Sequence, residues 1–132
     1  MKKYFSFVIL LVIACTPVSA QNFKDQIAAK ASAILPEMIQ WRRYLHEHPE
    51  LSNREFKTAE YITAHLKKLG LEVQTGIAKT GVVAILKGAK PGPCIALRAD
   101  IDALPVKERV NIPYASKDSA DYLGQKVPVM HA

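Results

Sequence analysis

The sequence predicts an α/β fold in which a mixed central sheet is flanked by helices. Two segments, 23–48 and a second ending at Leu69, carry apolar residues at helical spacing. Three shorter segments, 71–75, 81–87 and 94–99, are β-branched or apolar and are bounded by Gly and Pro. Helices with one apolar stripe bury that stripe against a sheet. At 132 residues the chain is long enough for one domain with one core.

The first twenty residues predict export. Lys2 and Lys3 precede a segment, 4–14, that is apolar apart from one Ser and is too short to span a membrane. Val18-Ser19-Ala20 has small residues where a signal peptidase cleaves, so we expect a signal peptide over 1–20 and a domain over 21–132. A lipoprotein anchor at Cys15 is the alternative. Both interpretations place the protein in the periplasm or outside the cell.

The first helix is expected over Phe23–His48 and should be kinked or split at Pro36. Its last turn carries His46 and His48, which stand two residues apart and therefore do not share a helix face. We interpret both as structural histidines and not as a metal pair. Pro49 ends the helix.

The second helix is predicted to begin with a capping box, in which Ser52 is the N-cap and Glu55 stands three residues later. Gly70 should end it. The residues expected to form its buried stripe are Phe56, Ala59, Ile62, Thr63, Leu66 and Leu69.

The turn at 88–93 predicts that strand 81–87 forms a hairpin with strand 94–99. The second of these is interpreted as a central strand buried on both faces, with Ile95 and Leu97 in the core. Cys94 should be a small buried residue, and after cleavage of the signal peptide it has no disulfide partner. Residues 106–129 are expected to form a long loop.

Two acids follow the predicted central strand. Asp100 and Asp102 would share one face if the strand continues, and Pro105 ends it. They are either turn residues or the paired acids of a site at the carboxyl end of the strand. The net charge is +6, but Lys and Arg alternate with Glu and Asp along the chain, as on a solvated surface and not as in a basic patch. We therefore expect no nucleic-acid partner, and no G-x-G-x-x-G motif indicates a nucleotide.

Five blocks of the sequence match the motifs of one protein family. In chain order they are Arg42–Ser52, Glu55 with Thr58, Thr80–Ala84, Arg98–Pro105 and Met130–Ala132. With these blocks the chain resembles the metal-dependent amidohydrolases, which include hippurate hydrolases, N-acyl-amino-acid amidohydrolases and auxin-conjugate hydrolases and are related to carboxypeptidase G and aminoacylase. The resemblance covers about residues 33–132, and the order of its blocks makes it specific.

The resemblance implies a hydrolase with two divalent metals, zinc or manganese, that cleaves the amide of N-acyl amino acids or small peptides. It implies that Asp102 is a catalytic acid near the metals, and that Asp100 and Arg98 lie close by without being the main ligands. Arg98 could pair with either acid. The expected ligands, Cys and His of a C-G-H-D motif, lie beyond Ala132, so no residue present is assigned as a metal ligand. The complete protein is expected to be a homo-oligomer.

Two hypotheses follow from where this resemblance stops. In the first, the chain is the N-terminal part of an exported amidohydrolase, namely of its di-metal exopeptidase-like catalytic domain, and is inactive alone. In the second, it is a complete non-catalytic binding or interaction domain of the same fold. Residues 116–129 are a few residues longer than the family pattern leads us to expect.

Overall fold

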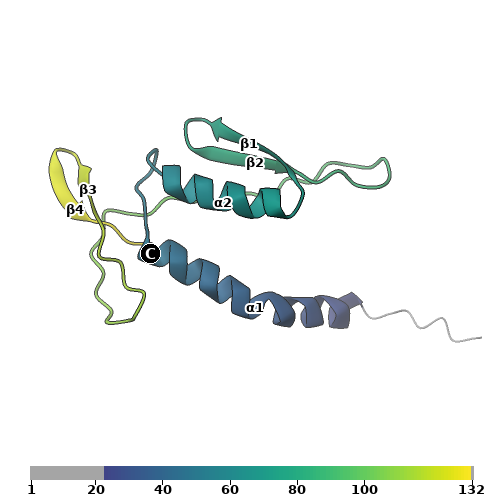
Figure 1. The fold of residues 1–132 in the computed structure, drawn as a ribbon, viewed down its shortest axis with the longest axis horizontal. Coiled ribbons are helices and arrows are strands. Elements are labelled where there is room, and N and C mark those ends of the chain that lie inside the picture. Colours follow the sequence, from purple (N-terminus) through teal and green to yellow (C-terminus); the bar gives the residue numbers. More distant parts are fainter. Residues whose placement is uncertain (1–22, 132) are drawn as a thin grey trace, which may run out of the picture. The chain divides into compact units, whose positions relative to one another are not determined.

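A computed structural model describes residues 23–131, so the predictions for the signal peptide and for Cys15 lie outside the described residues. The chain divides into two units, residues 1–34 and 35–132. The described part of the first unit is the beginning of helix α1, and the rest of α1 and all other elements belong to the second unit. The elements in chain order are α1 (Phe23–Glu47), α2 (Phe56–Lys68), β1 (Glu72–Ile77), β2 (Gly81–Ile85), β3 (Ser119–Tyr122) and β4 (Gln125–Pro128) (Figure 1).

Helix α1 continues without a break through Pro36, so the sequence-based expectation of a split is wrong. A proline inside a helix removes one backbone hydrogen bond, and the flanking turns keep theirs. The last turns of α1 pack on α2 through aromatic rings. Tyr44 stacks on Tyr61 with ring centroids 4.2 Å apart, and Trp41 meets the edge of His65 at 4.5 Å. None of the described helices is long and apolar enough to cross a membrane.

Helix α2 is capped by Glu50, and the predicted capping box of Ser52 and Glu55 is wrong. The Glu50 carboxylate accepts the backbone amides of Lys57 at 3.2 Å and Thr58 at 2.8 Å, and also the Thr58 hydroxyl at 2.9 Å. These amides belong to the first turn, where an acceptor with negative charge is favourable. Ser52 lies in the preceding turn and makes no cap.

Glu55 has a different partner from the one that the capping box requires. Its carboxylate accepts the hydroxyl of Thr80 at 2.7 Å, and both residues are buried. This bond joins the start of α2 to the residue before β2. The buried residues of α2 are Thr58 and Thr63, whereas Phe56 and Leu69 of the predicted stripe are 59% and 61% exposed.

Strands β1 and β2 pair with each other in antiparallel register, from Glu72 opposite Ile85 to Ile77 opposite Gly81, and lie against α2 (Figure 1). The predicted hairpin between 81–87 and 94–99 is therefore wrong. The short connection between β1 and β2 closes locally because Ala78 and Lys79 take left-handed φ angles of 46° and 96°.

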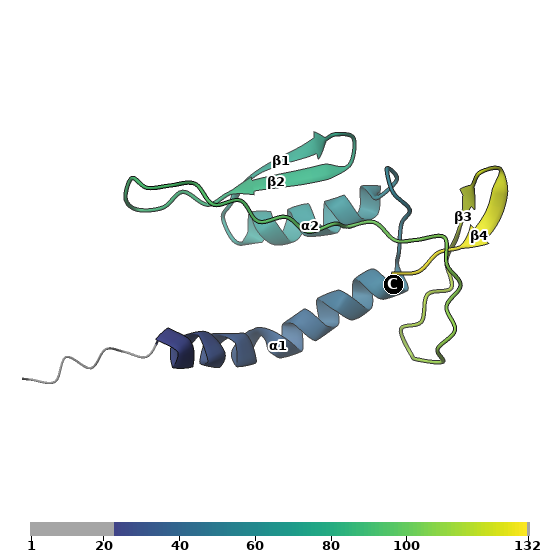
Figure 2. The ribbon, with the colours of Figure 1, turned by 180° about the vertical axis from the view of Figure 1, so that it is seen from behind.

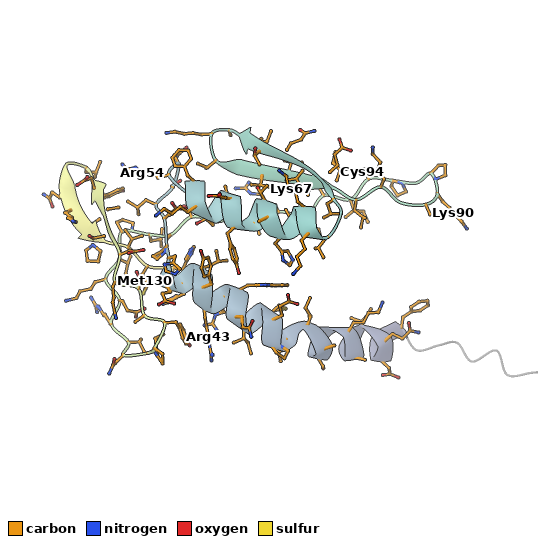
Figure 3. All side chains as sticks on the ribbon, viewed as in Figure 1. Arg43, Arg54, Lys67, Lys90, Cys94 and Met130 are labelled. Carbon is orange, nitrogen blue, oxygen red and sulfur yellow. The ribbon has the colours of Figure 1, made fainter. Side chains whose placement is uncertain are left out.

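Residues 86–102 form no strand: the chain leaves β2, turns back in a loop and continues without regular structure (Figure 2), so the predicted central strand is not formed. Ile95 and Leu97, expected in the core, are 82% and 95% exposed. Cys94 is exposed as well, in contrast to the prediction of a buried residue (Figure 3). A strand needs a neighbour for its backbone groups. Within residues 23–131 the two named sheets are two-stranded and neither includes this segment.

The predicted loop at 106–129 contains a second antiparallel hairpin, β3–β4, which corrects that prediction. Its turn places Leu123 and Gly124 at positive φ, as a two-residue hairpin turn requires. Val129 follows β4 and is 2% exposed. It forms the small core with Leu51 and Ala103, while isolated bridges join Leu51 to Ala103 in parallel and Leu104 to Met130 in antiparallel sense.

The capping assignment predicts unequal effects of two neighbouring substitutions. Glu50→Ala should lower the free energy of unfolding by about 1–2 kcal/mol, because amides of the first turn of α2 lose their acceptor. Ser52→Ala should change it by less than about 0.5 kcal/mol. Urea unfolding followed by circular dichroism measures both changes. Equal effects of the two substitutions would contradict the assignment of Glu50 as the cap and favour the capping box.

The bond between Glu55 and Thr80 predicts a pH-dependent contribution to stability. Burial raises the pKa of Glu55, but bonds from the Thr80 hydroxyl and from nearby backbone amides lower it more, so the pKa lies below the usual 4.5. A lowered pKa stabilises the fold above pH 4.5, and this contribution is lost as the pH falls through the lower, folded value.

Thr80→Val keeps the shape of the side chain and removes the hydroxyl donor. We expect a loss of about 1–3 kcal/mol at neutral pH and a smaller loss in acid. Thr75→Val, on the exposed face of β1, is the matched control. Unfolding curves between pH 3 and pH 7 provide the measurement. A loss that does not depend on pH would contradict the role of the carboxylate.

Candidate functional site

The first predicted acid forms an ion pair on the surface. Arg98 approaches Asp100 with Nη2 2.9 Å and Nε 3.2 Å from the same carboxylate oxygen. Both side chains are largely exposed, at 87% and 72%. Of the two acids that Arg98 could bind, it therefore binds Asp100. A pair this exposed contributes little to stability.

Asp102 lies apart from that ion pair, in a half-buried position at the end of the segment 86–102. The next residue fixes its place, because the Ala103 amide donates to the Glu50 carbonyl at 2.7 Å. Ala103 is also bridged to Leu51 and is 2% exposed. The backbone at Asp102 is thus held by the connection between α1 and α2. The strand that would align Asp100 and Asp102 on one face is absent.

His131 is placed near Asp102 by a backbone bridge. Leu104 and Met130 exchange hydrogen bonds of 3.0 Å and 3.1 Å, which brings the last described residues beside the acid motif. Burial lowers the pKa of His131, the charge of His46 lowers it further, and the charge of Asp102 raises it. The net pKa lies below 6.5, so the imidazole is neutral at pH 7. Its Nε2 atom is buried and has no hydrogen-bond partner within residues 23–131.

His46 has a partner that sequence reasoning did not identify. Its Nε2 atom lies 2.7 Å from Oε2 of Glu108, and their side chains are only 19% and 12% exposed. The hydrogen bond from His46 and those from the Val110 and Arg109 amides hold the pKa of Glu108 below its usual value. Glu108 gave no signal in the sequence because it is an isolated acid in an irregular segment. The other histidine of the pair, His48, packs on the Tyr44 ring at 4.7 Å.

A cavity of about 520 Å³ lies beside these groups. Among its lining residues are the basic or neutral nitrogen groups of Arg42, His46 and His131, the acid Asp100, and the apolar side chains of Ile62 and Ile101. Its mixture of polar and apolar side chains is typical of a small-molecule site.

The described residues do not by themselves fit a metal ion. Within residues 23–131 no three His, Cys, Asp or Glu side chains lie close enough together to hold one. The unpartnered Nε2 of His131 is one available donor, and Cys94 stands exposed on the segment 86–102. Bound metals in proteins usually take three or four protein ligands. The described residues alone therefore form no metal site.

Comparison with known proteins gives the family. No family model matches the chain. It is 49% identical over 86 residues to an N-acetyl-L-cysteine deacetylase of Bacillus subtilis, across 65% of the chain and 21% of that protein. It is 39% identical over 109 residues to an N-acyl-L-amino acid amidohydrolase of Geobacillus stearothermophilus, across 83% of the chain and 27% of that protein.

A solved structure agrees with these relatives. A dinuclear metal-binding peptidase of the M20 family from Bacillus subtilis shares 44% identity, with a TM-score of 0.65 over 76% of this chain and 26% of that one. The homologues of the chain are amidohydrolases and peptidases of the M20 family. This confirms the predicted amidohydrolase resemblance and the α/β class of the fold. The chain spans about a quarter of the length of the relatives it matches.

The surroundings of His131 predict how it titrates. Its imidazole should remain neutral to a pH below 6.5 in the folded chain. Asp102→Asn should lower the pKa further, because it removes the charge that favours the protonated ring. Two-dimensional NMR of ¹⁵N-labelled imidazoles measures this, with Asp121→Asn as an exposed control. An unchanged His131 pKa in Asp102→Asn would show that the two groups are not coupled.

Proposed function

We propose that the described residues are part of an exported metal-dependent hydrolase that cleaves the amide bond of N-acyl amino acids or related small peptides. The observation that carries the proposal is the identity of 39–49% to an N-acyl-L-amino acid amidohydrolase and to an N-acetyl-L-cysteine deacetylase. Two divalent ions, zinc or manganese, would be the cofactor, in agreement with the dinuclear metal binding of the related peptidase.

The proposed roles of individual residues follow from their surroundings. Asp102 is the proposed catalytic acid, because its backbone is anchored through Ala103 and its charge reaches His131. Asp100 is neutralised by Arg98 at the cavity edge. Neutral His131 offers a nitrogen that can accept or donate one proton, according to its tautomer. We assign the metal ligands and the general base to residues outside the described range.

The export half of the proposal rests on residues 1–20, which carry a basic start, an apolar core and Val18-Ser19-Ala20. Mass spectrometry of protein from the native host should find Gln21 at the mature N-terminus. A diacylated Cys15 would support the lipoprotein anchor instead, and an intact Met1 in the cytoplasm would refute export.

The catalytic half predicts a contrast between two proteins. The 132-residue chain should bind zinc or manganese only weakly by calorimetry and should not hydrolyse N-acetyl-L-cysteine, because the described donors form no cluster of three. A protein that continues through a Cys-Gly-His-Asp motif should hydrolyse it. In that longer protein Asp102→Ala should lower kcat by about 10- to 100-fold with little change in Tm.

Asp121→Ala, an exposed acid on β3, is the matched control for Asp102→Ala and should leave kcat unchanged. If the 132-residue chain hydrolysed the substrate and a chelator abolished this activity, the chain would contain a functional metal site, and the proposal that its donors form none would be wrong. Absence of hydrolysis in the longer protein would favour a non-catalytic binding domain.

A further inference from the structure

His46 lines the cavity, and its side-chain partner Glu108 lies 62 residues away in the sequence. We infer that they are positioning residues, which help to fix the segment 102–114, and through it His131, against the end of α1. The catalytic consequence of this inference rests on the proposed amidohydrolase function. The structural consequence does not, and it is tested separately below.

The Glu108 carboxylate is oriented by its own neighbouring backbone as well as by His46. Its Oε1 atom accepts the backbone amides of Arg109 at 2.9 Å and Val110 at 3.0 Å. Its Oε2 atom is then directed at Nε2 of His46, at 2.7 Å. An ionised carboxylate only accepts hydrogen bonds, so Nε2 of His46 must carry the proton. The pair therefore selects both the ring orientation and the protonated nitrogen of His46.

A second contact attaches the same segment to α1. The Tyr114 ring meets the edge of the His46 ring with centroids 6.0 Å apart. The Arg43 guanidinium lies over the same Tyr114 ring, 4.9 Å from its centroid. Arg43 and His46 are three residues apart and share a helix face (Figure 3 labels Arg43). The segment is thus held at two points on the last turns of α1.

These contacts bear on the site because of what precedes Glu108. Leu104, four residues earlier, makes both backbone bonds to Met130 that place His131. Ala103 is fixed to Glu50, directly after α1. The segment that follows Asp102 is therefore fixed at Ala103 and again at Glu108. His46 and His131 both line the cavity, so loss of the pair would move two of its walls.

The charged and titratable groups near the pair are consistent with this role. Tyr114 contacts both His46 and Arg43, and the charge of His46 reaches His131. The lowered pKa of Glu108 keeps its carboxylate ionised near neutral pH.

The test uses amide hydrogen exchange, measured by NMR on the 132-residue chain. In Glu108→Ala the amides of Leu104 and Met130 should exchange about tenfold faster or more, because the anchor next to their bridge is lost. The paired amides of β1 and β2 should not change. Glu108→Gln keeps an oxygen that can accept the His46 proton, and it should therefore retain most of the protection that Glu108→Ala loses.

Glu60→Gln, an exposed acid on α2, is the control and should change neither set of amides. Unchanged exchange at Leu104 and Met130 in Glu108→Ala would overturn the inference. Equal acceleration in β1 and β2 would also overturn it, because the pair would then support the whole fold and not one segment.

The catalytic consequence is tested in the longer, active protein. Glu108→Ala should lower kcat by about tenfold or more while KM changes little, because a positioning residue alters the alignment of reacting groups more than substrate binding. If wild-type protein shows no hydrolysis, the proposed function fails, and the exchange experiment still decides the positioning role. If hydrolysis is present and kcat is unchanged in Glu108→Ala, the inferred role in catalysis is wrong.

Discussion

The structure depends on Glu50, which acts through both its side chain and its backbone. The carboxylate caps α2 by accepting the amides of Lys57 and Thr58, and it also accepts the Thr58 hydroxyl. The carbonyl of the same residue accepts the Ala103 amide at 2.7 Å. One residue thus fixes the start of a helix and the acid motif more than fifty positions later. The bond to Ala103 uses the main chain alone, whereas the cap of α2 requires the carboxylate.

The sequence blocks that carry the family resemblance contact one another in space. Glu55 bonds Thr80 of the Thr80–Ala84 block, and Leu51 bridges Ala103 within the acid motif. Leu104 of that motif then bridges Met130. These residues therefore have a structural reason to occur together, apart from any role in chemistry. The buried contacts are hydrogen bonds between groups that would cost free energy if they were left unpaired.

Electrostatics divide the site region into paired and unpaired groups. Asp100 and Glu108 each have a cationic or donor partner, whereas the buried Nε2 of His131 has none within the described residues. Its neutral state follows mainly from burial. The Nε2 atom of His131 is therefore a desolvated nitrogen without a partner among the described residues.

The sequence by itself determined both helices, the strands near 72–77 and 81–85 and the family, because periodicity and short motifs are local properties. It did not determine the fate of 94–99, since an apolar run becomes a strand only where another strand receives its hydrogen bonds. The sequence also did not determine the cap of α2, because the local pattern favours Ser52 whereas the carboxylate of Glu50 accepts the first-turn amides. The contact between His46 and Glu108 spans 62 residues, so only the tertiary structure could bring them together.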